Sequence, residues 1–421
     1  MTNLYVPRIP TIDDLVARYK LEGSKVLLRV DFNSPINPKT GEILDDTRIR
    51  AHLETIRELV ERKCAVVIVS HQGRPGEDDF VTLERHAERL EKLLGMEVDF
   101  VDDVIGPEAR RRIKELEPGK ILMLDNVRLV SEEMIEALPE KQANTIFVKR
   151  LAPLFNYYIN DAFAAAHRSQ PSIVGFPMVL PSAAGRLMER EVNALRFLAS
   201  PAERPRVFVL GGGKVRDTLR IIEHLHAGRA ADRILTTGLV AEVFLAAKGV
   251  DIGAVNRRML EEKGLLSLIP RARYILLKGA PIETPIDFVT LTEDGEIKVE
   301  TVGAIKHLIR DVGPATVSMY GELMKDSKVI VLRGPAGVIE DPRFRKGTIG
   351  ILEAALSTRA YVIIGGGHLS SVISEVRKPS TALYHVSTGG GALLLFLAGE
   401  ELPALKALEL SARKHLGWGE E

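Results

Sequence analysis

The sequence predicts an α/β protein of two domains, and three observations support that prediction. The chain has 421 residues, which is more than one hydrophobic core usually supports. Short β-branched and apolar runs alternate with longer stretches of helical periodicity, as is typical of βαβ units and parallel sheets. Polar or glycine-rich segments follow several of the strand-like runs. We therefore expect two domains, each a Rossmann-like α/β sandwich around a parallel sheet.

The first half contains one set of these elements. The run KVLLRVDF at 25–32 is mostly β-branched and apolar, as is typical of strands that are buried on both faces. The expected elements, in order, are a strand at 25–32, a helix at 47–63, a strand at 65–70, a helix at 82–94, and strands at 97–101, 121–124 and 157–160.

The second half repeats the alternation. The segment 291–300 (LTEDGEIKVE) differs, because Asp294-Gly295 is a typical hairpin turn. The other expected elements are helices at 184–199 and 216–226 and strands at 206–210, 233–236, 274–277, 286–290, 328–332, 360–364 and 382–386.

The domain boundary is expected near 181–200. A long amphipathic helix begins after Pro181-Ser182, and Pro201 and Pro205 precede the next strand. This helix would connect domains at 1–183 and 184–398. A further helix or tail is expected at 399–421, and the sequence does not specify where it packs.

Composition excludes several classes of protein. Lys plus Arg equals Asp plus Glu at 57 each, so no net basic charge points to nucleic acid. Cys64 is the only cysteine, which excludes an internal disulfide framework and a multi-cysteine metal site. No apolar run has membrane-spanning length, and the N-terminal residues lack a signal-peptide core. We expect a cytoplasmic protein without membrane or nucleic-acid partners; the sequence does not indicate an oligomeric state.

Three triple-glycine runs follow strand-like segments in the second half: Gly211–Gly213, Gly365–Gly367 and Gly389–Gly391. Glycine allows close approach of backbone to a ligand, and amides at a helix start attract phosphate. Lys214 follows the first run and adds a positive charge. One such run alone more often marks a tight turn, but three at strand ends favour a polyphosphate site. The spacings of a P-loop and of a dinucleotide fold are both absent.

The strand ends of the first half are polar instead. Any one arginine there is more often a solvated surface residue, but parallel strands bring their carboxyl ends to one edge of a sheet. Arginine forms bidentate contacts with phosphate and carboxylate, so the group is suited to a phosphorylated carboxylic acid. No typical general-base motif is present, which suits phosphoryl transfer to an already ionised oxygen. The candidates are Asp31, Asn33, His71, Arg74, Arg128 and Arg168.

Six segments together resemble the phosphoglycerate kinase family over essentially the whole chain: RVDFNSP (29–35), SHQGRP (70–75), NDAFAAAHR (160–168), GGGKV (211–215), GPAGVIE (334–340) and HVSTGGGA (385–392). The resemblance implies the reaction 1,3-bisphosphoglycerate + ADP = 3-phosphoglycerate + ATP, with Mg²⁺. It also implies a glycerate-binding N-terminal domain, a nucleotide-binding C-terminal domain, and a cleft and hinge between them.

The resemblance assigns site residues by position. It implies catalytic roles for Arg48, Lys214 and the amides of Gly389, Gly390 and Gly391. The implied 3-phosphoglycerate site is Asp31, Phe32, Asn33, Arg48, His71, Gln72, Gly73, Arg74, Arg128 and Arg168. The implied nucleotide site is Gly211, Gly212, Lys214, Thr218, Gly337, Glu340, Gly365, Gly366, Gly367, His368 and Leu369.

Several positions depart from the usual family pattern, among them the TTGL segment at 236–239, which replaces a glycine pair. His368 stands where an Asp usually holds the metal-nucleotide, so the direct metal ligand stays open, because Mg²⁺ prefers oxygen. Thr218 replaces a lysine, and Arg333 replaces an asparagine. The GGGH loop and Thr218 are similar to the archaeal branch of the family. Two alternatives remain: a catalytically silent relative that senses these ligands, and an NAD-dependent oxidoreductase, which the absent G-x-G-x-x-G disfavours.

Overall fold

The computed structural model describes residues 4–419, apart from the side chain of His368. The chain forms two compact units. The N-unit comprises Val6–Asn193 and the segment that begins at Glu401, and the C-unit comprises Ala194–Glu400 with Leu4 and Tyr5. The chain passes from the first unit to the second inside helix α8 (Arg186–Ala199).

The N-unit is built on a six-stranded sheet with the order β3-β4-β2-β1-β5-β6. All its neighbouring strands are parallel. The strands are β1 (Lys25–Arg29), β2 (Ala65–Val69), β3 (Asp99–Val101), β4 (Ile121–Leu124), β5 (Tyr157–Asn160) and β6 (Ser182–Ala184). The helices are α1 (Ile12–Arg18), α2 (Thr47–Ala51), α3 (Leu53–Glu61), α4 (Glu84–Leu94), α5 (Pro107–Glu115), α6 (Pro139–Gln142) and α7 (Ile146–Leu151).

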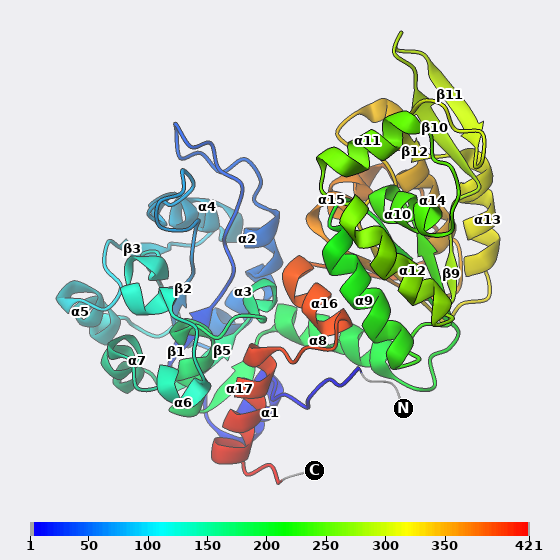
Figure 1. Ribbon diagram of the computed structural model, residues 1–421. Coiled ribbons are helices and arrows are strands. Elements are labelled where there is room, and N and C mark those ends of the chain that lie inside the picture. Colours follow the sequence, from blue (N-terminus) through cyan, green and yellow to red (C-terminus); the bar gives the residue numbers. More distant parts are fainter. Residues whose placement is uncertain (1–3, 420–421) are drawn as a thin grey trace. The chain divides into compact units, whose positions relative to one another are not determined.

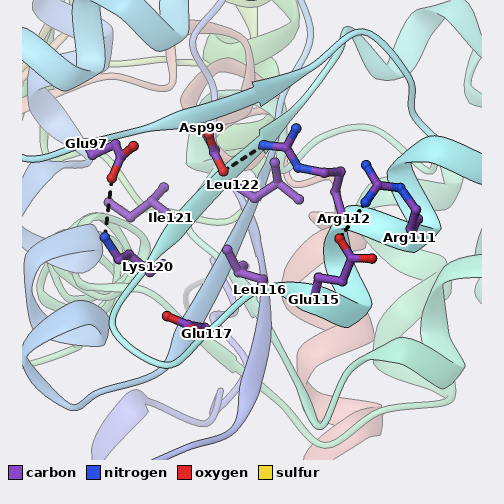
Figure 2. Close-up of a pocket in the computed structure, with 10 residues that line it drawn as sticks. All are labelled: Glu97, Asp99, Arg111, Arg112, Glu115, Leu116, Glu117, Lys120, Ile121 and Leu122. Carbon is purple, nitrogen blue, oxygen red and sulfur yellow. Dashed lines mark hydrogen bonds and ion pairs between the residues drawn. The ribbon is translucent and has the colours of Figure 1, made fainter.

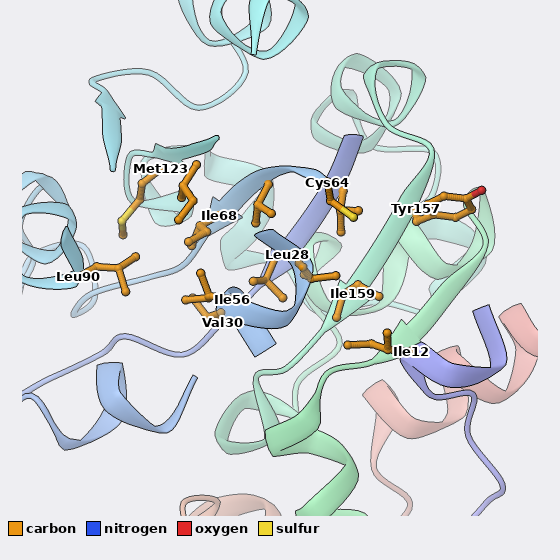
Figure 3. Packing of buried hydrophobic residues seen from close by; sticks show 14 of the residues in the cluster. Ile12, Leu28, Val30, Ile56, Cys64, Ile68, Leu90, Met123, Tyr157 and Ile159 are labelled. Atoms are coloured by element: carbon orange, nitrogen blue, oxygen red, sulfur yellow. The ribbon is translucent and has the colours of Figure 1, made fainter. Parts of the chain in front are cut away.

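Apolar layers cover both faces of this sheet, because the interior positions of its central strands β1 and β2 are apolar. Val26 and Leu28 of β1 belong to one buried cluster, whereas Leu27 belongs to a second. Successive side chains of a strand point to opposite faces, so the two clusters lie on opposite sides of the sheet. Figure 3 shows part of the first cluster, in which Leu28 and Ile68 from neighbouring strands pack with Ile56 of α3.

The C-terminal helix α17 (Pro403–Ser411) belongs to the N-unit, and Figure 1 shows it beside α1. The Tyr19 hydroxyl donates to the carbonyl of His415 at 2.7 Å, and Arg18 Nη1 donates to the carbonyl of Leu416 at 2.9 Å. The Ala404 amide donates to the Ala166 carbonyl at 3.1 Å. The end of the chain therefore stabilises the domain that its beginning forms.

The C-unit contains a second six-stranded parallel sheet, with the order β15-β14-β13-β7-β8-β9, and an antiparallel sheet, β11-β10-β12. The parallel strands are β7 (Arg206–Leu210), β8 (Arg233–Thr236), β9 (Ile282–Glu283), β13 (Val329–Arg333), β14 (Tyr361–Gly365) and β15 (Leu383–Ser387). The antiparallel strands are β10 (Asp287–Leu291), β11 (Ile297–Thr301) and β12 (Leu308–Val312). The helices are α9 (Val215–Ala227), α10 (Gly238–Ala247), α11 (Ala254–Glu262), α12 (Ile269–Leu277), α13 (Pro314–Met324), α14 (Lys346–Leu356), α15 (Gly367–Val372) and α16 (Gly390–Leu397).

The predicted α/β class, with a parallel sheet in each half of the chain, is confirmed. The hairpin at 291–300 is also confirmed, because β10 and β11 pair antiparallel across the Asp294-Gly295 turn. The strand expected at 274–277 is wrong, since these residues form the last turn of α12. The expected cleft and hinge stay predictions. Within residues 4–419, we find no helix that is both long and apolar enough to cross a membrane.

Candidate active site

The polar residues predicted in the first half follow the carboxyl ends of N-unit strands. Asp31 and His71 come two residues after β1 and β2, and Arg128 comes four residues after β4. Burial lowers the pKa of His71 well below its usual value, and the positive charges of Arg29, Arg128 and Arg168 lower it further. These arginines are thus close enough to act on one imidazole. We use the name arginine site for the following residues: Arg29, Asp31, Arg48, His71, Arg128 and Arg168.

The arginine site fixes the protonation of His71. Nη2 of Arg29 lies 3.1 Å from Nδ1 of His71. A guanidinium can only donate, so Nδ1 accepts and a neutral ring carries its proton on Nε2. The lowered pKa keeps the ring neutral near pH 7. His71 therefore offers the site a hydrogen-bond donor rather than a charge.

Asp31 orients Arg48, the residue expected to meet the transferred group. Nη1 of Arg48 donates to Oδ2 of Asp31 at 3.0 Å, and the Asp31 side chain is only 6% exposed whereas that of Arg48 is 41% exposed. Burial alone would raise the pKa of Asp31, but His71, Arg48 and Arg29 together hold that pKa below its usual value. Because His71 is neutral, the two arginines are the cations that keep Asp31 ionised. One end of Arg48 is thus fixed while the side chain remains accessible.

Arg128 is a buried cation with a donor that no described residue satisfies. Its side chain is buried, and its pKa is lowered to about 10 by burial and by the charges of Arg168 and Arg29. Nη1 donates to the Gly73 carbonyl, but Nε has no hydrogen-bond partner among the residues that the structure describes. A buried donor without a partner is costly. A phosphate or carboxylate at this position would satisfy it.

The side chains of two predicted site residues are buried within the N-unit. Gln72 is fully buried, accepts from the Ser34 amide at 2.9 Å and lies 3.1 Å from His86 Nε2. Phe32 is also fully buried. Both side chains are engaged in packing, so they hold the backbone of the site rather than present groups at its surface.

The remaining predicted residues belong to the segments that follow β1, β2 and β5. Oδ1 of Asn33 accepts from the Gly73 amide at 2.9 Å. Gly73 has φ of +63°, and a Cβ there would lie 2.5 Å from the carbonyl oxygen of Asp79, so glycine is required. Arg74 is exposed, and Nη1 of Arg168 lies 3.3 Å from Oε1 of Glu136.

The glycines predicted in the C-unit fall into two groups, and the first group is required by packing. A Cβ on Gly211 would lie 2.0 Å from Oγ1 of Thr237, and one on Gly337 would lie 2.3 Å from the carbonyl oxygen of Phe344. A Cβ on Gly365 would meet a methyl group of Leu393 at 2.4 Å. These glycines allow neighbouring loops to approach each other.

The second group lies at two helix starts, and within it Gly366 and Gly367 face open space. Gly366 has φ of +100°, and no atom of the described chain lies within 4 Å of the position of a Cβ on Gly366 or Gly367. Gly366 is the N-cap of α15 and Gly389 is the N-cap of α16. A Cβ on Gly390 would lie 3.6 Å from the Cα of Gly366. The two helix starts are therefore neighbours, and we call Gly366, Gly367 and Gly389–Gly391 the open glycine loops.

The other nucleotide-site candidates differ in exposure. Lys214 is exposed at the N-cap of α9, and Glu340 is exposed after β13. Thr218 is fully buried, and its hydroxyl donates to the Lys214 carbonyl at 3.1 Å, so it supports α9 rather than replaces a lysine charge. Leu369 is buried. The side chain of His368 lies outside the described part of the structure.

The charged cavity in Figure 2 is not part of this site. It has a volume of about 470 Å³ and lies at the amino ends of β3 and β4, at the edge of the N-unit sheet opposite the arginine site. Its cations are paired: Arg112 with Asp99 at 2.7 Å and Lys120 with Glu97 at 3.3 Å. Paired side chains leave little charge for a ligand.

Sequence reasoning missed Arg29, His52 and Asp161. Arg29 is fully buried and contacts His71 and Ser172. Its signal was a charged residue inside an otherwise apolar strand. Nδ1 of His52 lies 2.8 Å from Oδ2 of Asp161, and Nε2 of His52 accepts from the Asp31 amide. Nothing in the two separate sequence segments indicates that His52 and Asp161 pair.

Comparisons with known proteins agree on one family. A sequence model of "Phosphoglycerate kinase" matches residues 13–400. The chain is 57% identical over 403 residues to phosphoglycerate kinase of Sulfurisphaera tokodaii and 55% identical over 403 residues to that of Sulfolobus acidocaldarius, covering 96% of this chain and 96% of the relative in both cases. The crystal structure of phosphoglycerate kinase from Pyrococcus horikoshii has a TM-score of 0.88 and 39% identity, covering 96% of this chain and 100% of that one.

Proposed function

The chain belongs to the phosphoglycerate kinase family, and on that premise we propose that the arginine site binds 3-phosphoglycerate and the open glycine loops bind the nucleotide phosphates. The activity is that of a phosphotransferase with a carboxyl group as acceptor. It transfers a phosphoryl group reversibly between 1,3-bisphosphoglycerate and ADP, giving 3-phosphoglycerate and ATP.

In this proposal the N-unit is the glycerate domain. Arg128 and Arg168 bind the anionic ends of 3-phosphoglycerate, while His71 donates from Nε2. Arg48, oriented by Asp31, reaches the phosphoryl group as it is transferred. The acceptor carboxylate is already ionised, so no side chain has to remove a proton. Charge neutralisation and positioning are then the main contributions to catalysis.

The C-unit is the nucleotide domain in the same proposal. Amides of Gly389–Gly391 at the start of α16 point toward phosphate oxygens, and the positive end of the helix dipole favours their charge. Lys214 supports the transferred group, and Glu340 binds the ribose hydroxyls. C-terminal α17 belongs structurally to the glycerate domain, so the domain sequence is discontinuous. A hinge that closes the two domains together remains part of the proposal.

Mg²⁺ is proposed to enter with the nucleotide. Residues 4–419, excepting the His368 side chain, contain no group of three or more His, Cys, Asp or Glu side chains that could hold a metal ion. We therefore propose that phosphate oxygens and water supply most of the ligands of the ion, which is how Mg²⁺ is commonly bound in kinases. Bound there, it would neutralise charge on the β- and γ-phosphates. The substrates suggest a cytoplasmic location.

The observation that best supports the arginine site is the buried Nε of Arg128, which has no partner among the described residues. The test is a coupled assay in which ATP and 3-phosphoglycerate yield an acyl phosphate that is reduced at the expense of NADH. We expect turnover by the wild-type protein and a large rise in KM for 3-phosphoglycerate in Arg128→Ala. Tight binding of both ligands without turnover would instead identify a silent sensor. An unchanged KM in a folded Arg128→Ala variant would refute the site.

A further inference from the structure

A buried chain of hydrogen bonds runs from the arginine site to the start of α8. The Asp31 amide donates to Nε2 of His52 at 3.1 Å, and Nδ1 of His52 lies 2.8 Å from Oδ2 of Asp161. Oδ1 of Asp161 accepts from the amides of Leu187 at 2.9 Å and Met188 at 3.2 Å. Each of these residues lies in the N-unit.

Both side chains in the middle of this chain are removed from water. The His52 side chain is 2% exposed and that of Asp161 is 0% exposed. The Phe32 ring packs against the imidazole, with ring centroids 5.7 Å apart. The backbone next to Asp161 is also tight, because a Cβ on Gly185 would lie 2.3 Å from Oδ1 of Asp161. Asp161 therefore cannot easily move away from His52.

The contacts of His52 determine which nitrogen carries the proton. A backbone amide can only donate, so Nε2 must be the acceptor and must be bare. Nδ1 then carries the proton and donates to the Asp161 carboxylate. Protonation at Nε2 would place two donors against each other at the Asp31 amide. One tautomer alone satisfies every group in the chain.

We propose that His52 is a positioning residue of the arginine site, which holds the backbone of Asp31, and through it Arg48, against the rigid anchor of Asp161. The proposal rests on the proposed function, because it assumes that Asp31 and Arg48 form the 3-phosphoglycerate site. His52 does not touch the substrate. It fixes the backbone of Asp31, and the Asp31 carboxylate in turn orients Arg48 by accepting from Nη1 at 3.0 Å.

Two substitutions separate the two contacts of His52, one with the Asp31 amide and one with the Asp161 carboxylate. In His52→Gln the side-chain oxygen reaches the position of Nε2, so the Asp31 amide keeps an acceptor while the contact with Asp161 is lost. In His52→Asn the side-chain amide mimics Nδ1–H, so Asp161 keeps its donor while the Asp31 amide loses its acceptor. Both variants remove the ring, so each controls for the packing loss of the other.

We expect KM for 3-phosphoglycerate to rise at least about fivefold in His52→Asn, which is the scale of one lost hydrogen bond to a buried group. In His52→Gln it should stay within about threefold of the wild-type value. KM for ATP should stay within about twofold in both, since the C-unit is untouched. A purely structural defect would reduce the folded fraction, and thus the apparent kcat, but KM for 3-phosphoglycerate would then not differ between the two variants. Equal KM values for 3-phosphoglycerate in both variants would overturn the proposal.

A second measurement does not depend on substrate. In ligand-free protein with ¹⁵N-labelled histidine, NMR at neutral pH should show His52 with a protonated Nδ1 and a bare Nε2. A proton on Nε2 would overturn the proposal whatever the kinetics. Arg128→Ala measured in parallel separates the two hypotheses. If its KM is unchanged, the proposed site fails; if its KM rises and the histidine variants behave alike, only the role of His52 fails.

Discussion

Arg48→Ala provides the sharpest test of the proposed chemistry, because the same helix contains a matched control. Arg48 and Arg50 both lie on α2. Arg48 contacts the buried Asp31, whereas Arg50 forms an ion pair with Asp46 at 2.7 Å, and its side chain is 54% exposed. Arg48→Ala and the control Arg50→Ala each remove one guanidinium from the same short helix. Only the first should affect phosphoryl transfer.

The expected magnitudes separate stability from catalysis. Loss of Arg48 leaves Asp31 with Arg29 nearby, and Arg48 is itself partly exposed, so we expect a stability cost of about 1 kcal/mol. An arginine that stabilises a transferring phosphoryl group contributes about 10³–10⁵ in kcat, or about 4–7 kcal/mol. Arg48→Ala should therefore lower kcat at least about 10³-fold in a folded protein. Arg50→Ala loses only an exposed surface pair, which contributes little to stability, and should keep kcat within about twofold.

The measurement is the coupled assay at saturating ATP and 3-phosphoglycerate, with thermal unfolding of each variant as the folding control. Arg48→Lys adds a further comparison, since it keeps the charge but loses the planar fork. We expect it to recover part of the lost rate. If Arg48→Ala keeps kcat within about tenfold of the wild-type value while it remains folded, Arg48 does not stabilise the transferred group. A similar loss in Arg50→Ala would point to a disrupted helix instead.

Three further outcomes are expected. Lys214→Ala should lower kcat at least about 100-fold while nucleotide Kd changes less than about threefold, because its contact strengthens in the transition state; loss of affinity with kcat intact would contradict this. Burial raises the pKa of Glu242 to about 8. Between pH 4.5 and 8 the folded protein therefore keeps a proton on this carboxyl that the unfolded chain has lost. The free energy of unfolding should fall by up to about 4 kcal/mol as the pH rises from 5 to 8. Urea unfolding should show that Glu242→Gln removes most of this slope, and an unchanged slope would exclude Glu242 as its source. Gly211→Ala should lower the unfolding midpoint, whereas Gly367→Ala should preserve the midpoint but raise KM for ATP; matching changes in both variants would argue against two kinds of glycine.

Local sequence patterns were sufficient for most of the fold. Strands such as β1 and β2 are apolar at consecutive positions, which only a strand covered on both faces requires. The error at 274–277 has a physical reason. The ILL run of α12 reads as a short strand, but Ala272 and Ile275 are buried while Leu277 is 80% exposed. That spacing is helical, and a four-residue window is too short to reveal it.

The candidate site was less accessible, because a side chain's role depends on neighbours far away in the sequence. Position after a strand indicated Asp31, His71 and Arg128. It did not indicate that Gln72 turns inward to Ser34 and His86. Nor did it indicate that Arg29, inside β1, fixes the tautomer of His71 from 42 residues away.

The glycines show the same limit most clearly. Gly211 and Gly367 both lie in triple-glycine runs after parallel strands, and the sequence describes them in the same way. A Cβ on Gly211 would meet Oγ1 of Thr237 from the next strand's loop, whereas no described atom lies near a Cβ on Gly367. Packing between loops accounts for the first glycine and leaves the second without a structural reason. A glycine that packing does not require is the stronger candidate for ligand contact, and that distinction appears only after the loops have been placed in space.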